Sequence, residues 1–334
     1  MHGSIKRLTA AVMSILIILS LAGCMGEDAF SLESTGTGTG ESATSSEYVR
    51  TEFDTLKNPY FALLDEAEKD AYSIIYEELS AGNSKFKCKA GINADQLKRT
   101  VDAVLDDHPE LFWIDNNYGY TFESGTGNVR ELKFKFFDFA DTPEKLKAAK
   151  ADFNNATTAV VTEAYNYDTA VERELFIHDF ICKNTTYDVS APYNQSAYSA
   201  LVLHKSVCAG YSRAFQHLMQ QLGFSCYYVP GNTYGLDIQQ DEGNPEDGSH
   251  SWNIVVIGGG YYNVDCLWDD TASDTFGRAV YPFFNVTDAA LIHHERADMA
   301  VYLPKCFATE YSYNNQFGDT IDSGSLVFTN SDEY

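Results

Sequence analysis

Two stretches after residue 48 repeat hydrophobic positions at helical spacing, and a third stretch alternates as strands do. The helical positions are Leu64, Ala67, Ala71, Ile74, Ile75 and Leu79 in the first stretch, and Leu97, Val101, Val104 and Leu105 in the second. Between residues 112 and 139 apolar and polar positions alternate, as at Leu132, Phe134 and Phe136, between Gly-rich turns. We therefore predict a small α+β region over residues 48–150.

The second half of the chain is predicted to place a cysteine at the start of a helix. Helical patterns cover residues 143 to about 164 and 171–182, and a third opens at Cys208. Its apolar positions are Tyr211, Phe215, Leu218, Met219 and Leu222, and Gly223 follows as a stop. Unpaired backbone N–H groups and the helix dipole favour a thiolate at this position, as a sulfur nucleophile requires. A buried, inert Cys208 is the alternative.

A hairpin downstream is predicted to bring a histidine and an aspartate together. Strands are expected over residues 224–229, 250–257 and 261–265, with Gly258 and Gly259 as a two-residue loop. That loop pairs position 252 with 265, which places His250 and Asp265 diagonally on one face, about 7 to 8 Å apart at the backbone. A carboxylate–imidazole hydrogen bond can span this gap. A structural role for His250 and a capping role for Asp265 are the alternatives.

Three short blocks around these residues are specific. They read Val207-Cys208-Ala209-Gly210-Tyr211, Ser249-His250-Ser251-Trp252-Asn253 and Tyr262-Asn263-Val264-Asp265. In order and spacing they resemble the bacterial transglutaminase-like superfamily, over roughly residues 171–284. Residues 107–113 also resemble a segment that precedes this domain in some bacterial members. Ser206 stands where glycine is common, and no tryptophan follows Cys208 as it does in animal transglutaminases.

The resemblance implies both a fold and a reaction. The fold is α+β, with a papain-like or transglutaminase-like core in which the nucleophile helix packs on an antiparallel sheet, and residues 151–334 form the catalytic domain. Cys208 is the nucleophile, His250 the general base and acid, and Asp265 the group that orients the imidazole. Attack on an amide gives a thioester, which water resolves in a peptidase or amidase and an amine resolves in a transglutaminase.

Several neighbouring residues have less defined roles. The Cys208 backbone N–H is expected to stabilise the oxyanion, with Gln195 or Tyr198 as candidates for the second donor. His178 is expected to pack or cap, and His217 to point away from Cys208, because nine residues are two and a half helical turns. The alternative from another class is a catalytically silent surface module that binds a peptide or glycan partner.

The N-terminal segment predicts export and lipid anchoring. Basic Lys6 and Arg7 precede an apolar run over residues 8–21, and residues 21–24 end on Cys24 as a lipobox does. This resembles the bacterial lipoprotein signal, so residues 1–23 are expected to be cleaved and Cys24 acylated. An uncleaved membrane helix is the alternative, but the run is shorter than the roughly 20 residues that a span needs. Residues 24–47 then form a Ser/Thr/Gly-rich tether, which places the protein outside the cell, held on the membrane.

The composition of the chain limits the classes of partner and cofactor that we expect. A net charge of −25 argues against nucleic acid and against a basic membrane patch, so the expected partner is a protein, peptide or wall-peptide substrate. Among the seven cysteines there is no Cys-x-x-Cys pair to suggest zinc. The acidic loop over residues 237–247 lacks an EF-hand pattern. We expect no cofactor and no obligatory metal, and disulfide pairing stays open.

Overall fold

The computed structural model describes residues 17–20, 50–234, 248–318 and 320–321. It combines helices with antiparallel sheets, so the predicted α+β class is confirmed. Cys24, the tether and the acidic loop over residues 237–247 lie outside the described residues. No described helix has both the length and the apolar character needed to cross a membrane.

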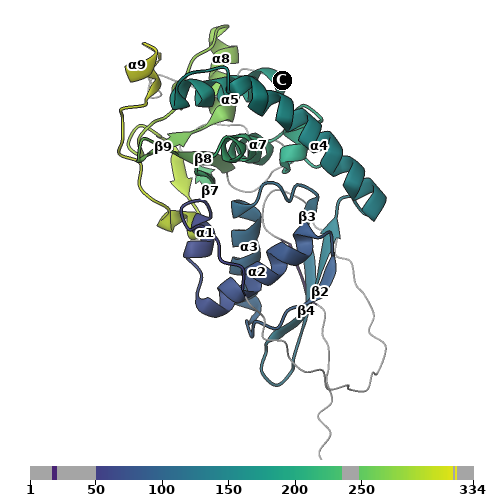
Figure 1. The fold of residues 1–334 in the computed structure, drawn as a ribbon. Coiled ribbons are helices and arrows are strands. Elements are labelled where there is room, and N and C mark those ends of the chain that lie inside the picture. The colour runs from purple at the N-terminus through teal and green to yellow at the C-terminus, as the bar shows by residue number, and fades with distance from the viewer. Residues whose placement is uncertain (1–16, 21–49, 235–247, 319, 322–334) are drawn as a thin grey trace, which may run out of the picture.

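The N-terminal part consists of a four-stranded sheet and three helices (Figure 1). The sheet has the order β1-β3-β4-β2 and is built from β1 (Ile17–Ser20), β2 (Lys85–Lys87), β3 (Ile114–Phe122) and β4 (Val129–Phe136). Strand β1 lies within residues 1–23, which the sequence predicts to be cleaved, so the predicted mature protein keeps β2, β3 and β4. The helices are α1 (Pro59–Ala62), α2 (Glu66–Ser80) and α3 (Ala94–Asp107). Capping boxes start α2 and α3, and Leu97, Val101 and Val104 are fully buried, as the helical spacing predicts.

Helix α4 (Pro143–Ala164) links this part to the rest of the chain. It starts where Thr142 caps the first turn and Pro143 occupies the first helical position, where a missing N–H costs nothing. It packs against α5 (Ala170–Asn184), α6 (Ala197–Leu201) and α7 (Cys208–Gln221). Residue 150, where the boundary between the two regions was predicted, lies inside this helix.

A second four-stranded antiparallel sheet carries the C-terminal half. Its order is β10-β7-β8-β9, formed by β7 (Cys226–Thr233), β8 (Ser249–Ile257), β9 (Gly260–Val264) and β10 (His294–Arg296). Helix α7 lies between α5 and the strands β7 and β8, near the middle of Figure 1. The remaining elements are the short parallel pair β5 (Thr186–Tyr187) and β6 (Lys205–Ser206), α8 (Cys266–Phe276), the 3-10 helix η1 (Asp298–Tyr302) and α9 (Tyr313–Gln316).

The hairpin of β8 and β9 has the predicted register. Asn253 pairs with Val264, and Ile257 pairs with Gly260, as the two-residue loop at Gly258 and Gly259 requires. The predicted end of the returning strand was wrong by one residue. Strand β9 ends at Val264, because Asp265 is the N-cap of α8 and its side chain accepts a hydrogen bond from the first turn of that helix.

Candidate active site

Cys208 is the first residue of α7 and is partly exposed. Its position at a helix N-terminus confirms the sequence prediction. The N–H groups of a first helical turn have no partner inside the helix, and they point toward the space in front of it. A negative charge on the sulfur, or on an oxygen beside it, is therefore favoured here.

Close packing explains why the block around Cys208 has a glycine at position 210. A side chain at this position would meet the Ser206 hydroxyl at 1.7 Å and the Asn194 carbonyl at 3.0 Å. The buried Ser206 hydroxyl donates to that carbonyl at 2.6 Å and lies 2.6 Å from the Ser199 hydroxyl. The departure from the family pattern at Ser206 is thus accommodated, since Gly210 leaves room for the hydroxyl where the chain enters α7.

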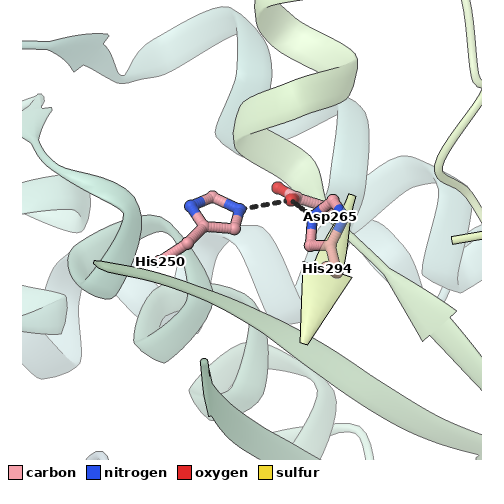
Figure 2. A group of neighbouring side chains, drawn as sticks. All are labelled: His250, Asp265 and His294. Carbon is pink, nitrogen blue, oxygen red and sulfur yellow. Dashed lines mark hydrogen bonds and ion pairs between the residues drawn. The ribbon is translucent and has the colours of Figure 1, made fainter. Parts of the chain in front are cut away.

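His250 and Asp265 form a buried hydrogen-bonded pair (Figure 2). His250 Nε2 lies 2.6 Å from Asp265 Oδ2. The second carboxylate oxygen, Oδ1, accepts a hydrogen bond from the Trp268 backbone N–H at 3.0 Å. Asp265 therefore caps α8 with one oxygen and holds His250 with the other, so both roles considered for this residue are present.

Side chains of the second block join the sheet to the nucleophile helix. Ser212 on α7 donates to the Ser251 carbonyl at 2.9 Å, and the Asn253 amide donates to the Ser212 carbonyl at 3.0 Å. The indole N–H of Trp252 donates to Asn263 at 3.2 Å across the hairpin. The two bonds that involve Ser212 fix β8 against α7, and thereby fix His250 relative to Cys208.

The charges of the three residues support one another. The His250 imidazolium holds the pKa of Asp265 well below its usual range, despite burial. Burial acts to lower the pKa of His250, but the Asp265 carboxylate and Cys208 raise it to about 10. Burial acts to raise the pKa of Cys208, yet hydrogen bonding to His250 and the His250 charge bring it below its ordinary value of 9.0. Because Asp265 occupies Nε2, Nδ1 is the nitrogen left for the sulfur.

The structure adds His294, which the sequence analysis missed. Its Nε2 lies 3.0 Å from the same Asp265 Oδ2 that binds His250. His294 comes from β10, 29 residues after Asp265. The only signal in the sequence is the adjacent pair His293 and His294, and nothing in that pair indicates that β10 lies beside β7.

Within the described residues, one group of side chains could approach a metal ion together. His250, Asp265 and His294 present ligand atoms within 4.8 Å of one another. A tetrahedral zinc ion with bonds near 2 Å separates its ligand atoms by about 3.3 Å, so the 2.6 Å contact between His250 and Asp265 fits a hydrogen bond. We describe this group as a hydrogen-bonded cluster, and the expectation of no obligatory metal stays a prediction.

A second cysteine, Cys182, also lies beside a histidine that is bonded to an aspartate. His178 Nε2 is 3.1 Å from Asp269 Oδ2, and Cys182 Sγ is 3.9 Å from the His178 ring nitrogens. The Cys182 thiol donates to the Cys266 carbonyl at 3.2 Å, and burial holds the pKa of Cys182 well above its ordinary value. His178 is buried against Phe284, as the predicted packing role requires.

The remaining candidates take structural positions. Tyr198 stacks on Phe139 with ring centroids 4.5 Å apart, and Gln195 lines a small cavity that Arg213 also lines. His217 packs on Phe153 of α4 at 4.7 Å, so the prediction that it points away from Cys208 is confirmed. The second oxyanion donor proposed at Gln195 or Tyr198 stays a prediction.

Comparison with known proteins finds similarity in the segment of the chain that contains Cys208, His250 and Asp265. Residues 155–266 match the sequence model of the Transglutaminase-like superfamily. The chain is 25% identical over 183 residues to the kyphoscoliosis peptidases of Mus musculus and Homo sapiens; the match covers 52% of this chain and 27% of each relative. It thus spans about a quarter of the length of these relatives.

Two solved structures show weak likeness. A TGase is 13% identical with a TM-score of 0.30, and the match covers 58% of this chain and 47% of that chain. The periplasmic domain of TgpA from Pseudomonas aeruginosa is 10% identical with a TM-score of 0.28, covering 44% and 59%. We draw no conclusion from scores this low.

Proposed function

We propose, because residues 155–266 match the sequence model of the Transglutaminase-like superfamily, that the chain is a thiol acyl-transfer enzyme that acts on amide bonds through Cys208, His250 and Asp265. One observation carries the proposal. Asp265 holds His250 at 2.6 Å, and His250 lowers the pKa of Cys208, the first residue of α7. This arrangement supplies a nucleophile, a base and a group that orients the base.

The proposed reaction begins with the Cys208 thiolate attacking the carbonyl carbon of an amide. The tetrahedral oxyanion accepts a hydrogen bond from the Cys208 backbone N–H at the start of α7. The C–N bond breaks as His250 donates its proton to the leaving amine, and a thioester remains on Cys208. His250 then takes a proton from water or from a second amine, which attacks the thioester and frees the sulfur.

Asp265 serves this cycle by holding one ring nitrogen of His250. While the carboxylate accepts from Nε2, Nδ1 remains directed to the sulfur and to the leaving group. The same carboxylate stabilises the imidazolium between attack and departure of the amine. The name of the matched relatives, a peptidase, supports an amide bond as the target.

The proposed substrate is a peptide, protein or wall peptide outside the cell. The apolar N-terminal run that ends on Cys24 supports a lipid anchor, and the net charge of −25 supports a role away from nucleic acid. In this proposal the enzyme works on a bacterial surface, held by the acylated Cys24.

The test is a screen of the purified protein for two activities, hydrolysis of peptide amides and incorporation of a fluorescent primary amine into protein. We expect one of them in the wild type and none in Cys208→Ala. Cys182→Ala is the matched control, since Cys182 also lies beside a histidine but has its thiol bonded to a carbonyl. A screen in which Cys208→Ala keeps the wild-type turnover rules out Cys208 as the nucleophile, and a wild type without either activity favours the silent binding module.

A further inference from the structure

His294 lies against the carboxylate that orients His250. Figure 2 shows the Asp265 carboxylate between the two imidazole rings. His250 Nε2 is 2.6 Å from Asp265 Oδ2 and His294 Nε2 is 3.0 Å from the same oxygen. The Trp268 N–H binds the other oxygen, so three nitrogen groups surround one buried carboxylate.

The other nitrogen of His294 also faces an acceptor. His294 Nδ1 lies 2.8 Å from the Ile292 carbonyl oxygen. A carbonyl and an ionised carboxylate can only accept, and a neutral imidazole has one N–H to donate. The neutral ring therefore satisfies one of its two contacts, and it holds Asp265 only when its N–H is on Nε2; the imidazolium satisfies both.

The backbone and the packing hold His294 in this place. His293, the residue before it, has a φ of 63°, in the left-handed region that residues other than glycine adopt rarely. The His294 side chain is fully buried, with ring centroids 4.2 Å from Trp268 and 5.0 Å from Trp252. A ring enclosed by two indoles has little freedom to leave the carboxylate.

We propose that His294 is a positioning residue of this site, which acts on His250 through the Asp265 oxygen that the two histidines share. The inference rests on the proposed function. His294 and the Trp268 N–H hold the two oxygens of the carboxylate, so that Oδ2 stays in line with His250 Nε2. In addition, the His294 ring can bind a proton, as the His250 ring does, so the cluster has two histidines that titrate.

The charged groups around His294 determine when that proton binds. Among the described residues, Asp265 and His250 face its ring, whose other neighbours are Trp252, Trp268 and Phe283. Burial lowers the pKa of His294 from its ordinary value of 6.5; Asp265 opposes this, and the charge on His250 adds to it. His294 is therefore neutral at neutral pH and takes up a proton in acid. That second cation on Oδ2 repels the His250 imidazolium and reduces the Cys208 thiolate.

The experiment measures the rate at which iodoacetamide alkylates Cys208 as a function of pH, in a double-mutant cycle. His294→Phe fills the space but donates nothing, so the carboxylate loses one of its holding bonds. We expect the rate at neutral pH to fall by about 10-fold, the size of effect that a small misplacement produces. In the Asp265→Asn background the same substitution should change the rate by less than about 2-fold, because the shared carboxylate is already gone.

His294→Gln is the conservative variant. Its amide can donate to Asp265 but cannot become a cation, so it should restore most of the rate at neutral pH. It should also make the acid limb of the profile shallower than in the wild type. His217→Gln is the control for replacing a buried histidine, since His217 packs on Phe153 away from the site.

Two results would overturn the inference. One is a loss in His294→Phe that is equally large in the Asp265→Asn background, as a general packing defect would give. The other is a wild-type profile in both His294 variants. If circular dichroism shows that His294→Phe does not fold, the cycle is run with His294→Gln. Its change in the acid limb should then disappear in the Asp265→Asn background, and a change of equal size there would overturn the inference. Alkylation needs no substrate, so failure to find turnover would sink the proposed function without deciding this point.

Discussion

The guanidinium of Arg213 lies 3.0 Å from the carboxylate of Asp106, and this contact joins the helix that carries Cys208 to the end of α3. Arg213 also lies over the Tyr228 ring at 4.0 Å, and Gln216 donates to the Asp106 carbonyl at 2.7 Å. Burial raises the pKa of Asp106 to about 7, although Arg213 opposes the rise. The N-terminal part is thus attached to α7 through polar groups that are largely shielded from water.

Replacing Arg213 should destabilise the protein, and more so at high pH. In Arg213→Met a buried Asp106 loses its partner, so its folded-state pKa rises further above the unfolded value. A group with a raised pKa contributes stability below its unfolded pKa and loses it as pH rises through the folded pKa. We expect a loss of about 3 kcal/mol near pH 8 and much less near pH 5, measured by urea unfolding. Adding Asp106→Asn should restore part of the loss, and an equal loss at both pH values would contradict this account.

Cys208 should react with a thiol alkylator before the other described cysteines. Its pKa lies below the ordinary value, because His250 and its charge outweigh burial. Burial raises the pKa of the other five, which are Cys88, Cys182, Cys226, Cys266 and Cys306. Limited labelling at neutral pH followed by peptide mass spectrometry should find the label on Cys208 first. Equal labelling of Cys182, which is also partly exposed, would argue against an activated sulfur.

Asp265→Asn should slow the reactions of the Cys208 sulfur without unfolding α8. Asparagine is a good N-cap, so the bond from the Trp268 N–H can be kept, but the charge that steadies the His250 imidazolium is lost. The pKa of Cys208 should rise, and turnover should fall by on the order of 10- to 10³-fold, less than in serine enzymes because a thiol is more acidic. The loss should shrink as pH rises. Alkylation profiles that superimpose on the wild type would show that Asp265 does not act through His250.

The buried Glu174 should make the stability of the protein depend on pH, independently of its activity. Burial raises its pKa to about 8, although Asn285 donates to one oxygen at 2.7 Å. Its other oxygen and the Asn285 side-chain oxygen are both buried without a partner in the described structure. In Glu174→Gln the new amide can donate to Asn285. The wild type should lose up to about 4 kcal/mol between pH 5 and pH 8, and the variant should not. Thermal melts at both pH values decide this, with exposed Glu163→Gln as the control.

Cys24→Ala should leave the protein folded but not acylated. The Ser/Thr/Gly-rich composition of residues 31–46 separates the anchor from the folded part, so the substitution should not affect the core. Metabolic labelling with a fatty acid and membrane fractionation measure the outcome. Lipid label that persists in Cys24→Ala would sink the lipobox assignment.

Local pattern was enough to predict the elements around the site. Helical spacing placed Cys208 at the start of α7, and the loop at Gly258 and Gly259 set the register that brings His250 near Asp265. The turn of the chain at Asp265 was harder to predict, because a strand residue and a helix cap look alike in a short apolar run.

His294 shows what local pattern cannot reach. Its contact with Asp265 depends on β10 pairing with β7, where His294 lies opposite Thr233, 61 positions earlier in the chain. Periodicity in a single sequence carries no information on which edge of a sheet a three-residue strand joins. The ion pair of Arg213 and Asp106 is of the same kind, since 107 positions separate its partners.

The dual role of Asp265 makes one amide proton a reporter on the whole site. The Trp268 N–H bonds to Oδ1 only while the first turn of α8 is formed, and the same carboxylate then presents Oδ2 to His250. Fraying of α8 would release the carboxylate and leave His250 without its partner, while the rest of the sheet stays folded. Hydrogen exchange at the Trp268 amide therefore measures how often the proposed catalytic groups come apart, and a molecule that loosens this one turn should inhibit the proposed activity without occupying the space in front of Cys208.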